Sequence, residues 1–424
     1  MRISARRAVA VAGALVLAVS ACGRGDDGGG VALTGACKGQ QTTGITDTSI
    51  KVGGAYPLSG PTSAYAEIPR GVRAHFDYLN AEKGGINGRK IEYVVRDTGG
   101  QPPKAVEEVR RLVEEDRVFA LFQTLGTAEN TAVWDYVNQR KVPHIFLSSG
   151  ASKWGTDTRH PWSMGWQPNY VAEARIYAAH LKKERPNAKV AVLYQNDDLG
   201  KDLLGGFKRA LADGAGPKIV AEQSYQTSDP SVEPQMRNLA ASDADVVLSV
   251  TTPKFSTQAL AADAKNTSWN PTFLLANVGA SVTALRPVGL ENVQGVISSG
   301  YYKDPPDPQW ADDPGMKLFK EKMLRYGGTE NPNDPFNAFG WAAAESWAKA
   351  MQAAKCPTRE GLRAAAENLG DVQIGMLLPG ITLGTGPGDR FPIESMQLMR
   401  FEGERWQTFG DIIDTREEFG AITG

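Results

Sequence analysis

A strand–helix–strand unit at residues 120–151 constrains the fold of this chain more than any other stretch. Its two apolar runs, residues 120–122 and 144–147, are separated by a turn at Gly126 and by apolar residues that recur at helical spacing. A proline just before the second run closes the helix. Two buried strands joined by a helix predict a parallel βαβ unit, and Thr127 stands where the helix N-cap is expected.

The loops that leave these two strands are small and polar. Residues 124–127 follow the first strand, and residues 148–150 follow the second. Ligands bind beyond the carboxyl ends of the strands in open α/β sheets, and hydroxyls beside a helix N-terminus suit a carboxylate or a carbonyl oxygen. The same residue types also build ordinary βα turns, so this stretch alone allows either interpretation.

The alternation of strand and helix continues along most of the chain. Further strands are predicted at residues 49–56, 91–95, 189–194, 219–223, 245–250 and 272–276, with helices between them. This order favours an α/β protein with two doubly wound lobes and a ligand cleft between them. Residues 396–401 and 406–412 alternate in the manner of a closing β-hairpin.

Three stretches interrupt the alternation and are interpreted as crossings between the lobes. They are residues 162–168, which we expect to be irregular, residues 293–301, and the glycine-rich residues 380–390. The crossings divide the chain into lobe 1, residues 48–166 plus 301–380, and lobe 2, residues 167–300 plus 391–424.

The N-terminus has the pattern of an export signal. Residues 1–21 combine a basic start with an apolar run that is too short to span a bilayer. The sequence around Cys22 resembles a bacterial lipobox, which implies cleavage before Cys22 and attachment of a lipid to its thiol; a plain secretory signal with a chance cysteine is the alternative. Residues 22–47 would then be the lipidated cysteine and a tether to the outer face of the cell membrane.

The remaining cysteines suggest a disulfide. Once Cys22 carries the lipid, Cys37 and Cys356 are left as a pair in a chain exported to an oxidising compartment. We predict that they are bonded to each other, and two free thiols are the alternative.

Composition and motifs argue against several function classes. The net charge is −2 with no basic domain, which argues against nucleic-acid binding. The chain has no G-x-S-x-G, H-E-x-x-H, Walker or dinucleotide fingerprint, so neither catalysis nor a cofactor is expected. Its four histidines show no metal-ligand spacing. His75 and His180 are expected at helix surfaces, and His144 at the start of a buried strand.

Three stretches resemble one family. They are IKVGGAYPLSGPTSAY at residues 50–65, NAEKGGINGRKIEYVVRD at 80–97 and YQNDDLGKDLLGGFK at 194–208. They are similar to the Leu/Ile/Val-binding proteins, type I periplasmic binding proteins that serve branched-chain amino acid and amide ABC transporters. The resemblance extends from about residue 50 to residue 409. It implies a monomer that captures a small organic ligand and passes it to permease and ATPase subunits; a sensor partner of a membrane receptor is the alternative.

The resemblance also assigns ligand-binding positions in both lobes. In lobe 1, the Leu125-Gly126-Thr127 loop would hold a ligand carboxylate, Tyr65 would form an aromatic wall and Phe336 an apolar pocket. The second loop supplies Ser148 and Gly150, and a one-residue slip of the alignment would bring in Ser149 or Ala151. In lobe 2, the assigned positions are Leu199, Thr252 and Asn277.

The lobe 2 positions depart from the family pattern. Leu199 and Thr252 fall where tyrosine is frequent, which implies room for a bulkier ligand. Asn277 falls where amino-acid binders place a carboxylate against the ligand ammonium, and a buried ammonium needs a charge partner. Asp197 or Asp198 can substitute for it, or can simply cap a helix. We therefore expect a ligand other than a simple branched-chain amino acid, and the class of amides and aromatic or organic acids is open.

Two tryptophans near the first crossing are further candidates. Trp154 and Trp166 can present aromatic faces to a ligand, or can pack the crossing segment.

Overall fold

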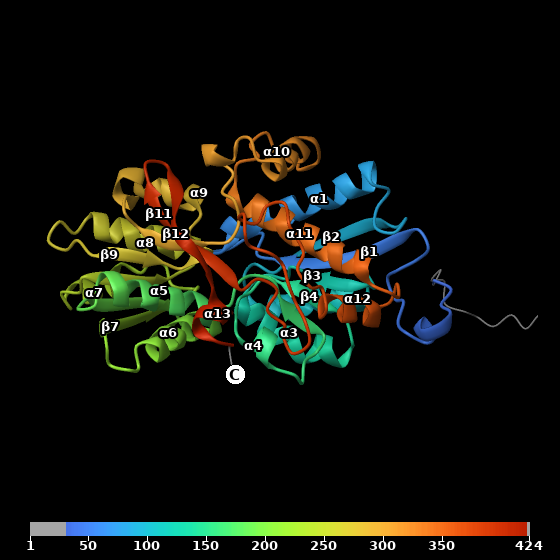
Figure 1. The fold of residues 1–424 in the computed structure, drawn as a ribbon, viewed down its shortest axis with the longest axis horizontal. Helices are drawn as coiled ribbons and strands as arrows, with labels where there is room; N and C mark the ends of the chain where they lie inside the picture. Colours follow the sequence, from blue (N-terminus) through green and yellow to red (C-terminus); the bar gives the residue numbers. More distant parts are fainter. Residues whose placement is uncertain (1–30, 422–424) are drawn as a thin grey trace, which may run out of the picture.

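The computed structural model describes residues 31–421. They form two lobes, each built on its own β-sheet (Figure 1). The predicted signal peptide, the lipidated Cys22 and the first part of the tether lie outside the described residues. None of the described helices is both long and apolar enough to cross a membrane.

The sheet of lobe 1 is parallel throughout, in the order β2-β1-β3-β4-β5. Its strands are β1 (Ser49–Tyr56), β2 (Lys90–Asp97), β3 (Ala120–Phe122), β4 (His144–Leu147) and β5 (Ser163–Gly165). The helices between them are α1 (Ile68–Glu82), α2 (Pro102–Glu114), α3 (Thr127–Gln139) and α4 (Lys153–Thr156), and the 3-10 helix η2 (Ser63–Glu67) precedes α1. Valine and leucine side chains of α2 and α3 cover one face of this sheet.

The other face of this sheet is covered by a helix from the C-terminal half of the chain. The late helices are α10 (Pro314–Tyr326), α11 (Pro335–Ala353) and α12 (Arg359–Ala366). Helix α11 is buried on nearly all sides and crosses α1 very closely, because both helices carry glycine at the contact. A Cβ atom on Gly71 would lie 2.0 Å from the carbonyl oxygen of Asn337, and one on Gly340 would lie 2.1 Å from that of Ile68.

The close packing of α1 on α11 explains why one prediction was wrong. His75 was expected at the surface but is buried, and its ring centroid lies 4.6 Å from that of Trp341 on α11. An amphipathic pattern does not reveal that a second helix will cover the polar side of α1. His144 is fully buried at the start of β4, as predicted.

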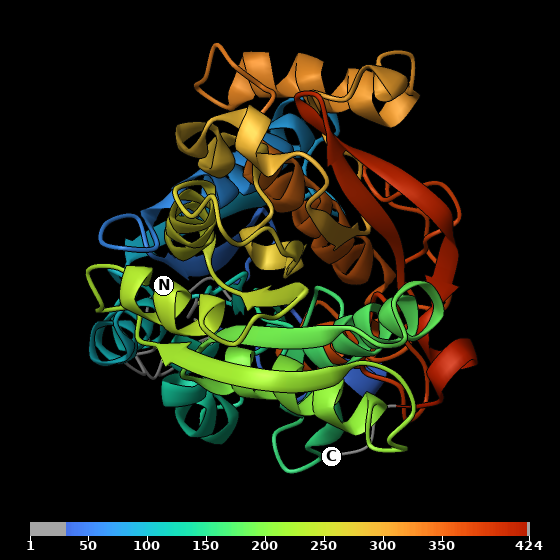
Figure 2. The ribbon, with the colours of Figure 1, turned by 90° about the vertical axis from the view of Figure 1, so that its left-hand side faces the viewer.

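The sheet of lobe 2 has the order β12-β11-β10-β9-β8-β6-β7. Its strands are β6 (Lys189–Gln195), β7 (Lys218–Tyr225), β8 (Val246–Val250), β9 (Thr272–Leu275), β10 (Ile297–Gly300), β11 (Ser395–Glu402) and β12 (Arg405–Asp414). The first five run parallel. Strands β11 and β12 form the predicted antiparallel hairpin, and β11 pairs antiparallel with β10. The hairpin forms one edge of this sheet (red in Figure 2).

The helices of lobe 2 follow the same alternation. The longer ones are α5 (Tyr170–Glu184), α6 (Asp198–Ala210), α7 (Glu233–Ala240) and α8 (Pro253–Ala264), and the short ones are η3 (Asn277–Gly279), α9 (Val282–Leu285) and α13 (Thr415–Phe419).

Two stretches predicted as crossings contain strands. Residues 162–168 include β5, which pairs with β4 at the edge of the first sheet, and residues 293–301 include β10, which pairs with β9 and β11. Both strands are short, and their partners come from elsewhere in the chain, so their own sequence gives a weak signal. The chain passes between the sheets three times: after β5, after β10 and before β11.

The predicted disulfide is confirmed. Cys37 and Cys356 are bonded, with their Cα atoms 5.6 Å apart and 319 positions apart in sequence. The bond fastens the segment before β1 to the turn that follows α11 in lobe 1.

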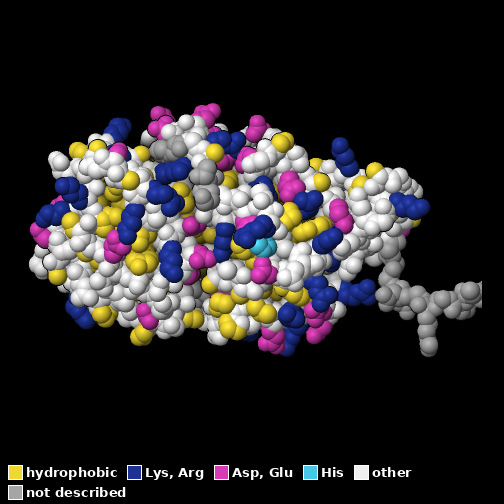
Figure 3. All heavy atoms as spheres, turned by 90° about the horizontal axis from the view of Figure 1, so that it is seen from below, with side chains coloured by type: hydrophobic (Ala, Val, Ile, Leu, Met, Phe, Trp, Pro, Cys, Tyr) yellow, Lys and Arg dark blue, Asp and Glu magenta, His cyan; other side chains and the backbone are white. Residues whose placement is uncertain are grey.

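The surface carries charges of both signs. On the face shown in Figure 3, lysine and arginine side chains alternate with aspartate and glutamate, in keeping with the net charge of −2. This face therefore shows no continuous basic patch of the kind that binds nucleic acid.

Candidate ligand-binding site

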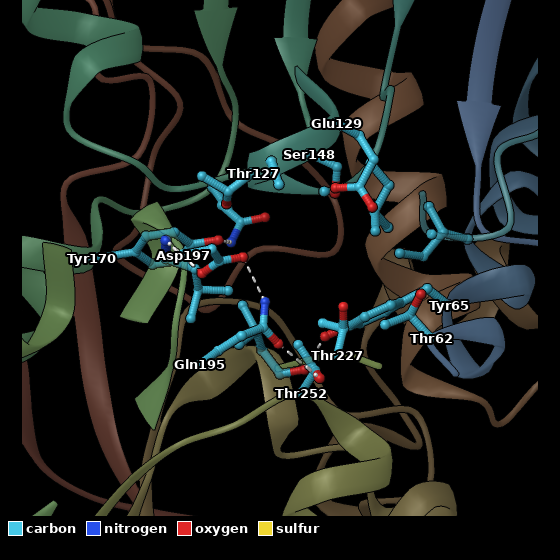
Figure 4. Close-up of a pocket in the computed structure, with 18 of the residues that line it drawn as sticks. Thr62, Tyr65, Thr127, Glu129, Ser148, Tyr170, Gln195, Asp197, Thr227 and Thr252 are labelled. Atoms are coloured by element: carbon cyan, nitrogen blue, oxygen red, sulfur yellow. Dashed lines mark hydrogen bonds between the residues drawn. The ribbon is translucent and has the colours of Figure 1, made fainter. Parts of the chain in front are cut away.

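A cavity of about 350 Å³ lies between the two lobes (Figure 4). Lobe 1 contributes η2, the start of α3, the loop after β4 and the start of α11. Lobe 2 contributes the loops after β6 and β8 and the short helix η3. The volume and the mixture of apolar and polar walls suit a small organic molecule.

Most residues predicted for the site line this cavity. They are Tyr65, Leu125, Thr127, Ser148, Leu199, Thr252, Asn277 and Phe336. Ser149 and Gly150 are close behind the wall but do not line it.

Thr127 has a different role from the predicted one. Gly126, with φ at 109°, occupies the N-cap position, so Thr127 is the first residue of α3 and does not cap it. Its hydroxyl instead lies 2.8 Å from that of Ser149. Ser149 Oγ accepts hydrogen bonds from the Trp154 indole and from the Ala151 amide. Ser149 can therefore donate to Thr127, which leaves the hydrogen of Thr127 free to point toward the cavity.

Gly150 permits a close approach by Tyr170. A Cβ atom at position 150 would lie 2.4 Å from the carbonyl oxygen of Pro168 and 2.9 Å from the Tyr170 ring. The Tyr170 amide also donates to the Gly150 carbonyl at 2.8 Å. Because Tyr170 itself lines the cavity, Gly150 shapes the wall without touching its interior.

In lobe 2, Asp197 both caps a helix and faces the cavity. Its Oδ1 accepts from the amides of Leu199 and Gly200 at the start of α6, and its Oδ2 accepts from the Gln195 side chain at 2.7 Å. The capping alternative was therefore right for Asp197, although the residue also lines the cavity. Asp198 does not line it, and its carboxylate pairs with Lys153 at 2.5 Å.

The side chain of Asn277 is partly occupied. Its Nδ2 donates to the Ser299 carbonyl at 2.5 Å, and its backbone amide donates to Glu173 at 2.7 Å. Glu173 is buried behind this wall and also accepts from the Tyr177 hydroxyl; burial raises its pKa. Asn277 therefore has its amide oxygen left for a ligand.

Tyr65 connects the two lobes directly. Its hydroxyl donates to the Val278 carbonyl of η3 at 2.9 Å, and its ring lies edge-on to that of Phe336, with centroids 5.0 Å apart. This hydrogen bond exists only when the lobes are close together.

Several lining residues were missed by sequence reasoning. The main ones are Glu129, Gln167, Tyr170, Gln195, Tyr301 and Tyr302. Gln195 ends β6 and joins the two sides of a network, because its amide oxygen accepts from the hydroxyls of Tyr225 and Thr252. The signal that could have found it is its place at the carboxyl end of a strand, the same argument that gave Thr127 and Ser148.

The two tryptophans pack the protein interior. Trp154 is buried against Trp134, and Trp166 is buried against Phe339 with its indole donating to Ser346. Neither lines the cavity, so the packing alternative was right for both.

The cavity is acidic. Glu129 and Asp197 are its carboxylates, and its lining residues include no lysine, arginine or histidine. Burial, together with the charge of Asp197, raises the pKa of Glu129 to about 7. Burial also raises the pKa of Asp197, despite the hydrogen bonds that its carboxylate accepts.

Comparison with known proteins identifies the family. Residues 49–405 match the family described as periplasmic binding protein. The chain belongs to the periplasmic binding protein family. Family membership implies an extracytoplasmic location and a role in binding a solute.

Curated and structural relatives of this periplasmic binding protein agree with that result. Leu/Ile/Val-binding protein homolog 7 from Brucella suis is 28% identical over 47% of this chain, and the match spans about half, 51%, of that relative's length. A branched chain amino acid ABC transporter structure from Thermus thermophilus with bound valine superposes with a TM-score of 0.78, at 17% identity, over 89% of this chain and 100% of the other.

A second structural relative has a different ligand in its name. The fatty acid ABC transporter substrate-binding protein from Thermomonospora curvata superposes with a TM-score of 0.75, at 21% identity, over 91% of this chain and 97% of the other. The predicted fold, that of a type I periplasmic binding protein similar to the Leu/Ile/Val-binding proteins, is thus confirmed. At these identities the structural likeness describes the fold and leaves the ligand to be argued from the cavity.

Proposed function

We propose that this periplasmic binding protein is anchored by a lipid on Cys22, captures a small organic ligand between its lobes and delivers it to the permease and ATPase subunits of an ABC importer. The observation that carries the proposal is the 350 Å³ cavity, which is lined from both lobes. A ligand there touches both lobes only when they are closed, so its binding stabilises the closed state.

Polar and apolar residues of the cavity would contact different parts of the ligand. Thr127 and Ser148 supply hydroxyl groups for a polar oxygen of the ligand, and Tyr65, Phe336 and Leu199 surround its apolar part. The remaining predicted positions complete the wall or support it, namely Leu125, Thr252, Asn277, Ser149 and Gly150. In this proposal the protein binds without catalysis and acts as a monomer.

The lobe division belongs to the same proposal. Lobe 1 would comprise residues 48–166 plus 301–380, and lobe 2 residues 167–300 plus 391–424. Each lobe then contains one of the two sheets, and closure would bend the connecting segments while each sheet moves as a unit.

A thermal-shift screen of the chain from Val31 tests the binding function. The panel contains amino acids, amides, amines, and aromatic and aliphatic acids at millimolar concentration. A ligand that binds the folded state raises the midpoint in proportion to RT ln(1 + [L]/Kd), so micromolar binders are detected. A panel without any hit would count against the proposal.

A threonine substitution tests the cavity assignment with any ligand that the screen finds. Thr127→Val removes a hydroxyl at constant size, and we expect binding to weaken by about 1–3 kcal/mol, measured by calorimetric titration. Thr257→Val is the matched control, because the Thr257 hydroxyl bonds to carbonyls of α8 and α9 outside the cavity. Equal affinities of wild type and Thr127→Val would contradict the assignment.

A further inference from the structure

We propose that the ligand carries a net positive charge and places an ammonium-type nitrogen between Glu129 of lobe 1 and Asp197 of lobe 2. This inference rests on the proposed function, because it names the class of ligand that the same cavity selects. It departs from the sequence-based expectation of amides and acids, in which Glu129 had no part.

The charges that line the cavity are unbalanced. The carboxylates of Glu129 and Asp197 belong to opposite lobes, and the lining residues offer no basic side chain. Closing the lobes brings two like charges together in a site that water partly leaves, where repulsion is stronger than in bulk solvent. A cation between them converts this repulsion into attraction, whereas an anion would add to it. The cavity thus favours closure around a cation.

Glu129 itself has no positively charged partner among the residues that the structure describes. It belongs to the first turn of α3, and its carboxylate lies over Gly126, where a Cβ atom would come within 2.0 Å of Glu129 Oε2. Glu129 makes no ion pair with any residue of the described chain, 31–421. Burying a carboxylate without a positive partner is costly, and an ammonium group of the ligand would be such a partner.

The hydroxyl of Tyr301, at the cavity wall, lacks a hydrogen-bond partner among the described residues. Tyr301 is 1% exposed, lines the cavity, and its hydroxyl has no hydrogen-bond partner within the described part of the chain. A buried hydroxyl without a partner is rare in folded proteins, and at a binding cavity a ligand group can supply the missing partner. A phenol oxygen can accept a hydrogen bond from an ammonium or a neighbouring N–H group.

A third carboxylate extends the acidic character. A smaller cavity of about 40 Å³ shares Asn277, Tyr302 and Phe336 with the main one, and Asp304 lines it. Both carboxylate oxygens of Asp304 are buried and lack hydrogen-bond partners among residues 31–421. Asp307 and Asp334 act on this carboxylate as like charges, and Lys320 acts in the opposite sense.

The inference also specifies the polar oxygen near Thr127 and Ser148. An oxyanion held there would lie beside Glu129, in the same turn of α3 as Thr127, and would face Asp197 of lobe 2, so the oxygen belongs to a neutral group such as an amide, a hydroxyl or a carbonyl. The hydroxyl donors of this loop suit a neutral acceptor equally well.

Compounds that share a skeleton but differ in charge test the inference. The probes are 3-methylbutylamine, leucine, 4-methylpentanamide and 4-methylpentanoate, with phenethylamine and 3-phenylpropanoate as an aromatic pair and cadaverine as a longer amine. We expect the amines to raise the midpoint most, and leucine, which adds a carboxylate to 3-methylbutylamine, to bind more weakly than that amine. Glu129→Gln and Asp197→Asn should each weaken amine binding at least tenfold.

Asp135→Asn is the matched control. Asp135 belongs to the same helix as Glu129 and its side chain is 80% exposed, so its neutralisation should leave amine affinity unchanged. Asparagine caps helices as well as aspartate does, so Asp197→Asn is expected to fold. Unchanged amine affinity in both cavity variants would overturn the inference.

The pH dependence gives an independent readout. The other titratable groups that face Glu129 in the cavity are Asp197 and buried tyrosines whose pKa values are raised by burial, so they stay neutral: Tyr65, Tyr170, Tyr301 and Tyr302. With a Glu129 pKa of about 7, amine affinity should rise from pH 6 to pH 8 as the carboxylate ionises. Binding of a carboxylate compound would change in the opposite direction.

The outcomes separate the inference from the proposed function. Binding of acids, neutral amides or leucine in preference to the amines would overturn the inference and leave the proposed function standing. If no compound of the panel raised the unfolding midpoint, the result would count against both the inference and the proposed function.

Discussion

The imidazole of His144 is enclosed by lobe 1 without a hydrogen bond. The side chain is fully buried, and neither ring nitrogen has a partner within residues 31–421. Burial lowers its pKa to about 3, well below the value of 6.5 for an exposed histidine. Near pH 6.5 the imidazole of His144 begins to take up a proton in the unfolded chain, whereas in the folded protein it stays neutral until the pH falls to about 3.

This difference makes a signed prediction about stability. Below pH 6.5 the unfolded chain binds a proton at position 144 that the folded chain does not, so the contribution of His144 to the free energy of unfolding falls by about 1.4 kcal/mol per pH unit. The loss continues as the pH falls toward about 3, the pKa in the folded state. We expect His144→Leu to lose less stability than wild type between pH 7 and pH 5, measured by urea unfolding.

The difference between the pH profiles of wild type and His144→Leu reports the contribution of His144 alone. Buried carboxylates with raised pKa values, such as Glu173 and Asp304, contribute with the opposite sign, but they are common to both proteins and cancel in the difference. Parallel pH profiles of wild type and His144→Leu would contradict the assignment.

For single residues, the sequence predicted which ones line the cavity better than it predicted what each one does. Thr127 and Ser148 were found because the carboxyl ends of parallel strands meet at one edge of a sheet. The N-cap role of Thr127 was wrong because the backbone conformation of Gly126 starts the helix one residue earlier. Glu129 was missed because only the closed pair of lobes turns a helix-terminal carboxylate into a cavity wall.

Among the elements, the crossing of α1 and α11 depends on the absence of a Cβ atom at the contact. Gly71 leaves no room for a Cβ, since the nearest atom would be a backbone carbonyl oxygen at 2.0 Å. We expect Gly71→Ala to lower the free energy of unfolding by about 1–3 kcal/mol, because the helices must separate to relieve the overlap. Chemical denaturation measures this change.

A glycine in α6 provides the control. A Cβ atom on Gly205 would meet just one atom within 4 Å, the end of the Arg209 side chain at 3.4 Å. Gly205→Ala should therefore stabilise the protein by about 0.4–1 kcal/mol through helix propensity and reduced chain entropy. Destabilisation of equal size at both positions would show that contact geometry is not the cause.

Elements with a clear local pattern were predictable from the sequence, including the short apolar strands β3 and β4, whereas β5 and β10 were not. Helix α2 and strand β1 carry enough residues for their periodicity to show. Strand β5 has three residues and β10 has four, and each is stabilised by neighbours that are remote in the chain. Their place in the sheets is a tertiary property that local pattern does not encode.

On the scale of the whole molecule, an ion pair outside the cavity connects the lobes. Lys153 on α4 contacts Asp198 on α6 at 2.5 Å, and its ammonium also lies near the rings of Trp134 and Trp154. Beside it, the Ser152 amide donates to Asp202 at 2.6 Å. These contacts are made between lobes, so they stabilise the closed state without touching a ligand.

We therefore predict that Lys153→Gln weakens ligand binding although the cavity is unchanged. The expected loss is about 0.5–1 kcal/mol, the range of a partly exposed ion pair, measured by calorimetric titration. Lys182→Gln is the control, because Lys182 pairs with Asp213 at 2.7 Å within lobe 2 and has a similar exposure. Affinity losses that are the same in both variants would refute a role in closure.

The Cys37–Cys356 bond has a mechanical consequence. It joins the chain ahead of β1 to the end of α11, so a pull on the N-terminus is shared between two parts of lobe 1 and does not pass through the three segments that connect the sheets. In a molecule held at that end, lobe 1 would be the fixed lobe and lobe 2 the lobe that moves. Under the proposed anchoring, force on the N-terminus would leave the connecting segments unloaded.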